Sequence, residues 1–241
     1  MALLFVSADR EYLLSPGETL ETDLGVLEIP NDVSPGDTVE THLGTEFAAR
    51  DLRGPDLFHH FERTGAPMMP RDIGLVMGHT GIASGDRVLD AGTGTGVLAA
   101  MLARAGADVI TYERDEAFAT VARENMELAG VEDSVDVREG DVTEHIAEHG
   151  SIDVVTLDTE DAAAVVAETP NLLVPAGFVA VYSPFVESSH KVVETAREAE
   201  LEEITTLETI QREMDFGDRG SRPSTAGVGH TGYLTFARNP V

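Results

Sequence analysis

The sequence has no cysteine, no tryptophan and only one lysine, Lys191, in 241 residues. Without cysteine the chain can form no disulfide, no thiolate nucleophile and no cysteine-ligated zinc site. It also lacks an apolar run of the roughly 20 residues that a membrane-spanning helix needs, and no signal peptide leads it. We therefore expect a cytoplasmic protein with no membrane partner.

Basic residues are scarce as a class, with 16 Lys and Arg against 44 Asp and Glu and a formal net charge of −28. High acidity with few aromatic residues is typical of disordered chains. Here, however, apolar segments recur periodically, and 42% hydrophobic residues suffice to bury a core. We interpret the acidity as the surface of a protein from a halophile, solvated at molar salt, where the Debye length is only about 3 Å.

A glycine-rich stretch at residues 87–98 organises the chain. A short apolar segment ends in Asp90, and Gly92, Gly94 and Gly96 follow at alternate positions before an apolar segment of helical length. This pattern predicts a buried strand, a tight turn and a helix start. Glycine permits positive φ and close backbone approach, so the turn can wrap a small molecule at the carboxyl end of the strand.

The acid before the glycines indicates which small molecule the turn binds. A dinucleotide turn presents backbone N–H groups to a pyrophosphate, which Asp90 would repel, whereas a ligand with an amine and a sulfonium suits this acid. Glu113, at the end of the next apolar strand, is placed to accept hydrogen bonds from ribose hydroxyls. Together these features predict binding of S-adenosylmethionine (SAM). A weak dinucleotide match at Gly94, Gly96 and Ala99 keeps a nicotinamide oxidoreductase as an alternative.

Two regions differ in their patterning. Residues 1–63 carry short alternating segments, at 2–6, 25–29 and 38–43, divided by turn signals. They predict a small β domain that packs on the larger domain or on a neighbouring subunit, because it cannot bury much surface alone.

From residue 64 to residue 241 strands alternate with helices. Strands are expected at 87–90, 109–112, 135–138, 152–157 and 178–182, and helices at 73–79, 97–105, 116–129, 162–168 and 186–199. Repeated βα units imply an α/β fold, with a parallel sheet covered by helices on both faces. The last two strands, near 203–210 and 232–237, have no helix between them, so one of them should be antiparallel.

Several motifs together resemble those of tRNA (adenine-N1)-methyltransferases of the archaeal and bacterial type. The motifs are 70–74 (PRDIG), 89–96 (LDAGTGTG), 112–113 (YE), 157–158 (LD) and 229–234 (GHTGYL). The glycine turn alone identifies only a methyltransferase; the last motif, with Arg222-Pro223 before it, is much more specific. The resemblance implies a Rossmann-like class I methyltransferase domain with a mostly parallel seven-stranded sheet, a tRNA substrate and a homotetramer.

The resemblance also implies roles for individual residues. The methionine part of the cofactor is expected along Gly92, Gly94, Thr95, Gly96, Val97 and Leu98. Glu113 would bind the ribose, Asp141 the adenine of the cofactor, and Phe118 would line the same pocket, while Asp158 falls at the catalytic carboxylate. The sequence departs from the family at Met69, where an aromatic residue could stack on the target base; methionine is apolar and polarizable and can pack against a ring.

Asp158 is the candidate for the chemistry itself. Adenine N1 is a weak neutral nucleophile, and its attack on a sulfonium methyl leaves positive charge on the base, so no general base is needed before attack. What helps is alignment of N1 with the methyl group and a carboxylate where the charge develops. We hypothesise that Asp158 accepts a hydrogen bond from the N6 amino group. The alternative is a turn or helix-capping residue.

Other candidates have structural alternatives as well. Glu113 could be a surface acid and Asp141 an ordinary turn residue. His230 either faces the RNA and the site or ties the last strand to its loop. His59 and His60 look like a metal pair, but no carboxylate or cysteine spacing completes a site, and we expect no metal.

Two stretches are not acidic: residues 50–71 and residues 211–238 each contain four arginines and three acidic residues. We expect them to frame the tRNA track, with Arg53, Arg71 and Arg222 binding phosphates. The adenosine should flip out of its loop to reach the cofactor. The alternative is that these arginines form ion pairs between subunits.

Two further functions remain open beside the oxidoreductase. A non-catalytic RNA-binding subunit of a methyltransferase assembly fits the departure at Met69, although Asp90, Glu113 and Asp158 are intact. A methyltransferase of another substrate would share the glycine turn, but it does not explain the motif at 229–234.

Overall fold

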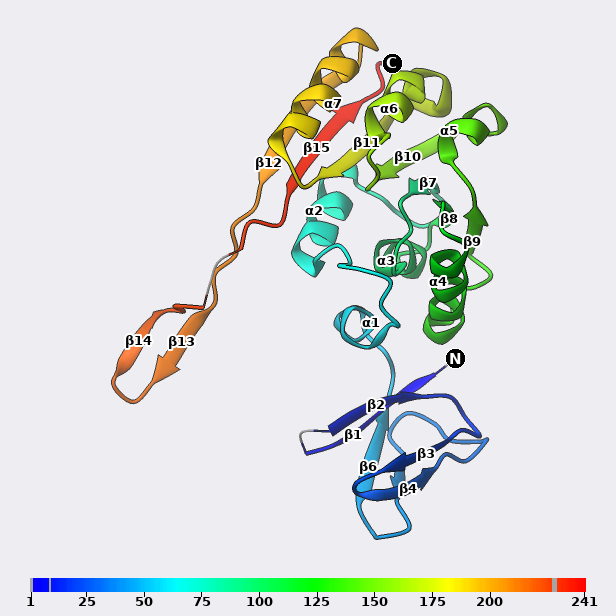
Figure 1. The fold of residues 1–241 in the computed structure, drawn as a ribbon, viewed down its shortest axis with the longest axis vertical. Coiled ribbons are helices and arrows are strands. Elements are labelled where there is room, and N and C mark those ends of the chain that lie inside the picture. The colour runs from blue at the N-terminus through cyan, green and yellow to red at the C-terminus, as the bar shows by residue number, and fades with distance from the viewer. Residues whose placement is uncertain (1, 9, 227–228) are drawn as a thin grey trace.

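The computed structural model describes residues 2–8, 10–226 and 229–241. Its main feature is a seven-stranded sheet in the order β12-β15-β11-β10-β7-β8-β9. The strands are β7 (Arg87–Ala91), β8 (Asp108–Glu113), β9 (Val135–Glu139), β10 (Ile152–Leu157), β11 (Leu173–Ser183), β12 (Glu202–Glu208) and β15 (Tyr233–Arg238). The five strands from β7 to β11 run parallel, and β15 runs antiparallel to both β11 and β12 (Figure 1). The predicted α/β fold, including one antiparallel strand, is confirmed.

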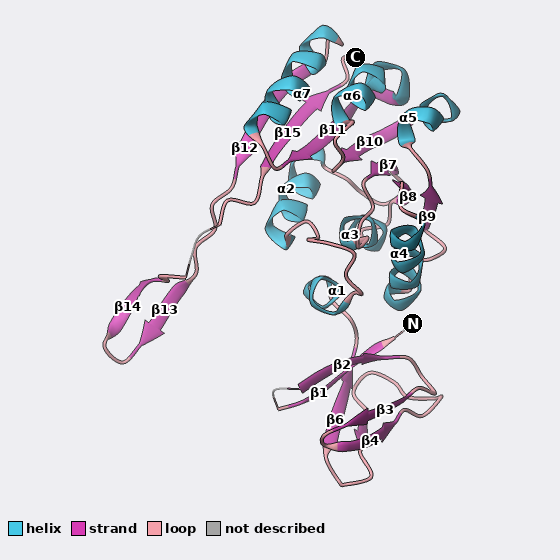
Figure 2. Ribbon diagram, in the orientation of Figure 1, coloured by secondary structure: helices cyan, strands magenta, loops and turns pink. Residues whose placement is uncertain are grey.

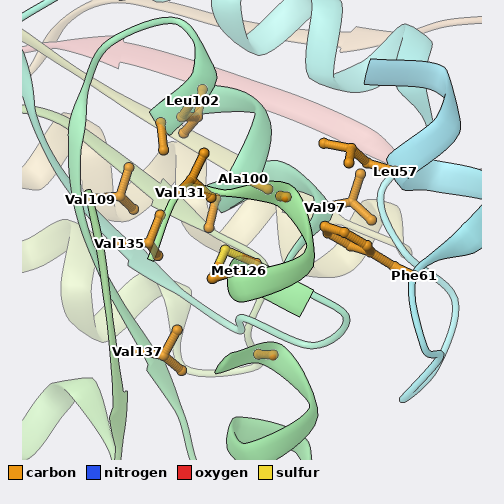
Figure 3. Close-up of a cluster of buried hydrophobic side chains, with 14 of the residues drawn as sticks. Leu57, Phe61, Val97, Ala100, Leu102, Val109, Met126, Val131, Val135 and Val137 are labelled. Carbon is orange, nitrogen blue, oxygen red and sulfur yellow. The ribbon is translucent and has the colours of Figure 1, made fainter. Parts of the chain in front are cut away.

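Helices cover both faces of this sheet (Figure 2). They are α2 (Pro70–Thr80), α3 (Val97–Arg104), α4 (Glu116–Ala129), α5 (Val142–His145), α6 (Ala162–Leu172) and α7 (Val186–Glu198), with a 3₁₀ turn at Ile146–Glu148. Neighbouring strand residues point to opposite faces, so Val88 joins the core under α3 and α4, and Leu89 joins the core under α6 and α7. Figure 3 shows the first of these cores. None of the helices in the described ranges combines the length and apolar character needed to cross a membrane.

Two helices exceed their predicted bounds for physical reasons. Helix α2 begins at Pro70 rather than at residue 73, because proline suits the first helical position, where an N–H would lack a partner in any case. Helix α6 continues through Pro170 to Leu172. The carbonyl of Val166, which the missing N–H of Pro170 cannot reach, accepts the hydroxyl of Thr169 at 2.7 Å instead.

The N-terminal residues form a small β region below the main sheet (Figure 1). Its four-stranded sheet has the order β2-β1-β6-β5, and β3 pairs with β4. The strands are β1 (Leu3–Ser7), β2 (Arg10–Leu14), β3 (Thr19–Thr22), β4 (Gly25–Glu28), β5 (Thr38–Glu40) and β6 (Glu46–Arg50), followed by helix α1 (Gly54–His60). Phe5 and Phe47 belong to a core of its own, whereas Leu4 and Leu57 join the core of the larger region. The division at residue 63 stays a proposal, since α1 precedes it and still packs into that larger core.

A buried amide ties the segment after α1 to the glycine turn. Asn125 on α4 is fully buried; its Nδ2 donates to the carbonyls of Glu62 (3.0 Å) and Thr95 (2.9 Å), and its Oδ1 accepts from the N–H of Glu62 (3.1 Å). A buried amide is stable only with such partners. Asn125 therefore holds the segment that begins at residue 62 against the glycine turn.

A third feature is the hairpin of β13 (Met214–Gly217) and β14 (Gly220–Pro223), which no sequence pattern predicted. It projects from the body of the molecule (Figure 1). All eight residues of its two strands are exposed.

Candidate functional site

The carboxyl ends of β7, β8 and β10 surround a cavity of about 400 Å³. Its wall brings together five of the predicted site residues: Gly92, Gly94, Glu113, Phe118 and Asp158. A smaller neighbouring cavity adds the other predicted turn residues, Thr95, Gly96, Val97 and Leu98, together with residues 64–68 of the segment after α1. In open α/β sheets this edge of the sheet is where ligands bind.

Gly92 has a conformation and surroundings that only glycine tolerates. Its φ is +88°, and a Cβ atom added there would lie 2.1 Å from the carbonyl oxygen of Asp158. The N–H of Asp158 donates to the carbonyl of Ala91 at 2.8 Å, which continues the β7–β10 pairing into the loop. The missing side chain thus lets the glycine turn and the loop that carries Asp158 touch.

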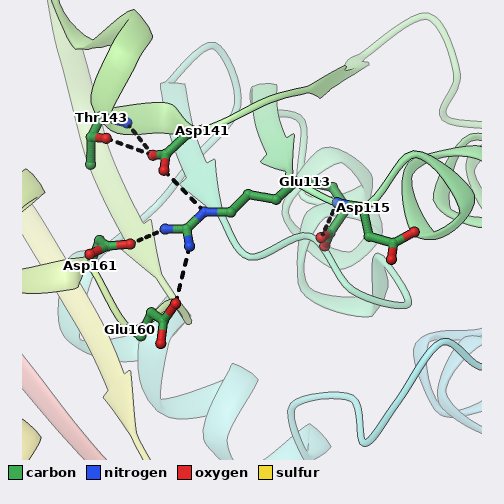
Figure 4. Close-up of polar contacts among 7 residues, drawn as sticks. Glu113, Asp115, Asp141, Thr143, Glu160 and Asp161 are labelled. Atoms are coloured by element: carbon green, nitrogen blue, oxygen red, sulfur yellow. Dashed lines mark hydrogen bonds and ion pairs between the residues drawn. The ribbon is translucent and has the colours of Figure 1, made fainter.

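Glu113 stands at the end of β8 and is anchored by backbone groups. One carboxylate oxygen accepts from the N–H of Gly94 at 2.9 Å. The other accepts from the N–H of Asp115 at 3.1 Å (Figure 4). Its side chain therefore lines the cavity in a fixed orientation. Glu113 is therefore not a freely solvated surface acid.

Asp90 lies beneath the turn rather than in the cavity wall. In the strand register it stands between Thr111 on β8 and Thr156 on β10. Its carboxylate accepts from both hydroxyls, at 2.6 and 2.5 Å, and burial raises its pKa. The predicted contact of Asp90 with a ligand amine is thus replaced by internal hydrogen bonds, and we assign this residue to support of the turn.

Asp158 follows β10 and is largely buried at a point that three cavities share. Within the described ranges its carboxylate accepts no hydrogen bond from the protein, and α6 has Asp161, not Asp158, at its N-terminal capping position. Burial, and then the charge of Asp90, raises its pKa to about 7. This placement does not fit a helix-capping role for Asp158. It fits a carboxylate that can bind a group from outside the protein.

Asp141 lies at the rim of the cavity and is engaged by the protein. It caps α5, accepting from the N–H and the hydroxyl of Thr143, and these bonds with the charge of Arg114 lower its pKa. The guanidinium of Arg114 lies 3.2 Å from Asp141, 3.2 Å from Glu160 and in contact with Asp161 (Figure 4). Sequence reasoning missed Arg114, although a basic residue directly after Glu113 in so acidic a chain was a usable signal.

The motifs at 70–74 and 229–234 meet in space. Arg71 donates to the hydroxyl of Thr231 at 2.7 Å, that hydroxyl donates to Asp72 at 3.2 Å, and the hydroxyl of Tyr182 donates to the Thr231 carbonyl. Burial raises the pKa of Asp72. The Arg71 side chain is only 12% exposed and joins α2 to the loop before β15, while its predicted contact with a tRNA phosphate stays a prediction.

His230 is held on both sides by the protein. Its Nδ1 lies 2.8 Å from a carboxylate oxygen of Glu208, and its Nε2 lies 3.1 Å from the carbonyl of Pro184. The Glu208 carboxylate raises the pKa of the imidazole, since the cation can donate to both partners. Of the two predicted roles, this geometry matches the structural one.

The remaining predicted residues lie outside these two cavities, and Arg222 lines a separate cavity on the hairpin. Met69 precedes α2 and is 37% exposed; Arg53 is exposed before α1, and Arg222 is exposed on β14. His60 lies 3.2 Å from Glu11. No group of three or more His, Asp or Glu side chains suited to a metal occurs in the part of the chain that the structure describes.

Comparison with known proteins agrees with this geometry. A family model described as the tRNA methyltransferase complex GCD14 subunit matches residues 60–220. The tRNA (adenine(57)-N(1)/adenine(58)-N(1))-methyltransferase TrmI of Methanocaldococcus jannaschii is 33% identical over 268 aligned positions, spanning 99% of this chain and 94% of that protein.

Two solved structures are similar in fold. A SAM-dependent O-methyltransferase from Thermotoga maritima has a TM-score of 0.83 at 24% identity and covers 100% of this chain and 93% of its own. The tRNA (m1A58) methyltransferase TrmI from Aquifex aeolicus has a TM-score of 0.75 at 21% identity and covers 99% and 96%.

The burial of Asp158 predicts a pH-dependent stability. Its pKa is about 7 in the folded protein against 3.8 for an ordinary aspartate, so ionisation favours the unfolded chain, and the stability present below the lower value is lost as the pH rises to about 7. Asp158→Asn should therefore raise the midpoint of thermal unfolding by several degrees at about pH 8. This gain should shrink steadily as the pH is lowered toward about 4. A gain independent of pH would contradict the assignment.

Proposed function

Because the chain belongs to the family of the tRNA methyltransferase complex GCD14 subunit, we propose that it is a tRNA (adenine-N1)-methyltransferase. It transfers a methyl group from SAM to N1 of adenosine at position 57 or 58 of tRNA. The observation that carries this function is the placement of Asp158, a largely buried carboxylate without a protein partner beside a glycine turn that leaves room for a ligand. Family membership sets aside the nicotinamide oxidoreductase.

The residues of the cavity fit SAM. The volume of about 400 Å³ lies within the range of small-molecule sites, and the Glu113 and Asp158 carboxylates in its wall favour a cationic ligand over a pyrophosphate. When bound, SAM supplies an electrophilic methyl group. We assign the ribose hydroxyls to Glu113, the adenine to the rim formed by Phe118 and Asp141, and the methionine part to the turn at residues 92–98.

Asp158 acts on the target base in this proposal. As a carboxylate it accepts a hydrogen bond from the N6 amino group, and this bond strengthens as positive charge develops on the adenine during attack by N1. The largely buried position excludes much of the competing water, which makes a fixed charge more effective. We propose that Met69, which is partly exposed, packs on the target base near the entrance of the site.

Substitution of Asp158 tests this mechanism. Asp158→Ala should lower kcat for tRNA methylation by about 100-fold to 1,000-fold, because the stabilising charge is lost, while the affinity for SAM measured by calorimetry changes little. For the wild type, single-turnover rates should rise with pH through about 7 as the carboxylate forms. Asp108→Asn, at the opposite edge of the sheet, serves as the control.

Near-full turnover of the Asp158→Ala variant would overturn the catalytic role. A wild-type protein that binds SAM but methylates no tRNA would instead match the non-catalytic subunit.

The tRNA track is proposed from two exposed arginines on separate elements, Arg53 beside α1 and Arg222 on β14. Arg53→Glu and Arg222→Glu should each weaken tRNA binding and reduce the slope of log affinity against log salt by about 1. Arg197→Glu, at the far end of α7, should change neither. Unchanged tRNA binding together with a lower molecular mass in solution would assign these arginines to ion pairs between subunits.

We propose further that the protein is a homotetramer from a halophile that acts in the cytoplasm, where tRNA is found. Isolated two-stranded ribbons are marginal in water, and Phe216 on the hairpin is 80% exposed, which favours burial of the hairpin against another copy. The net charge of −28 favours molar salt.

Light scattering tests the assembly and its salt dependence together. At about 1 M KCl, where charges are screened beyond about 3 Å, the mass should correspond to four chains, and Phe216→Ser should lower it. Transfer to dilute buffer should unfold the protein. Full folding and activity at low ionic strength would contradict the halophilic assignment.

A further inference from the structure

A second cavity, of about 480 Å³, begins at Asp158 and extends between the end of β11 and the helices α6 and α7. It shares Asp158, Thr159 and Glu160 with the cavity assigned to SAM. Its far wall includes Phe185, Ser188 and Lys191. A ligand there would lie directly beside the target base without overlapping the cofactor.

The far wall combines an aromatic ring with a cation. Phe185 is 66% exposed, and the adjacent Val186 is 54% exposed, so two neighbouring apolar side chains face solvent beside the cavity, as at binding sites. Lys191 is the only lysine in the chain, and within the described ranges no carboxylate oxygen lies within 4.0 Å of its ammonium; the adjacent His190 pairs with Glu194 instead.

The start of α7 adds a favourable field for an anion. Phe185 occupies the N-terminal capping position, and no side chain caps the helix there. The first backbone N–H groups of a helix lack partners within the helix and carry partial positive charge. Glu160 on the shared wall is paired with Arg114 at 3.2 Å, so its charge is partly compensated. Asp158 lies on the same wall and Glu187 lies in the first turn of α7, and Lys191 supplies the cation that offsets these acids.

We propose that this second cavity binds a ribonucleotide that flanks the methylated adenosine in the tRNA. The flanking base stacks on the Phe185 ring, and its phosphate is bound by the Lys191 ammonium and the Ser188 hydroxyl at the start of α7. This assignment rests on the proposed function, because it takes the target base to lie at Asp158. Stacking of unpaired bases on aromatic side chains is the common mode of RNA recognition.

The proposal also addresses how a chain of net charge −28 holds RNA at high salt. Phosphate contacts weaken steeply as salt rises, whereas stacking does not depend on released counterions. A ring exposed beside the reaction site therefore supplies affinity that salt does not remove. One lysine then orients the backbone and contributes little to the total affinity.

A thermodynamic cycle with altered RNA tests the stacking. A short hairpin RNA carrying the target adenosine is labelled, and its binding is followed by fluorescence anisotropy at fixed KCl, for the intact RNA and for RNAs with an abasic site on either side of the adenosine. Phe185→Ala should weaken binding of the intact RNA by about 10-fold. An abasic site on one side should weaken wild-type binding similarly, and the two changes together should cost no more than either alone.

Lys191→Gln tests the phosphate contact separately. It should reduce the slope of log affinity against log salt by about 1, whereas Arg197→Gln on the same helix should not. SAM affinity and the thermal midpoint serve as controls that the variants are folded.

The possible failures are distinguishable. If the Phe185→Ala loss and both abasic losses simply add, Phe185 contacts no flanking base and the proposal is overturned. Binding does not require methyl transfer, so a wild type that methylates no tRNA would refute the proposed function without deciding this test.

Discussion

The site depends on one close backbone contact, between Gly92 and the carbonyl of Asp158. The contact joins the turn that we propose binds SAM to the loop that carries the Asp158 carboxylate, and any side chain at position 92 would separate them. It is supported from below by Asp90, which holds β7, β8 and β10 together through two threonine hydroxyls. Backbone contacts and buried hydrogen bonds, not flexible surface side chains, thus fix the cavity proposed for SAM and the Asp158 carboxylate relative to each other.

Much of this arrangement follows from sequence patterning. The 42% of hydrophobic residues, alternating between strand and helix periods, predict the sheet, and the glycine turn predicts the ligand edge. What the patterning cannot give is the direction of a polar side chain that stands next to a partner from a distant strand. Asp90 reads as a ligand acid until the register places Thr111 and Thr156 on either side of it.

The same limit applies to Arg71 and His230. Both lie within motifs that resemble those of the family, but their partners, Thr231 and Glu208, are 160 and 22 residues away in the chain. The hairpin at residues 214–223 is exposed throughout, and its only apolar alternation, Met214 and Phe216, is too short to predict a strand. The tertiary fold determines which partners these side chains have, and a single sequence gives that information only indirectly.

Arg114 has one more consequence for the entrance of the cofactor cavity. It is one cation shared by three carboxylates on two loops, those after β9 and β10, and it comes itself from the loop after β8. Exposed ion pairs loosen as mobile ions compete for them, so electrolyte concentration sets how firmly these three loops are joined. Within the range of salt in which the protein is folded, we therefore expect the entrance to loosen as the salt concentration rises, without the movement of a domain.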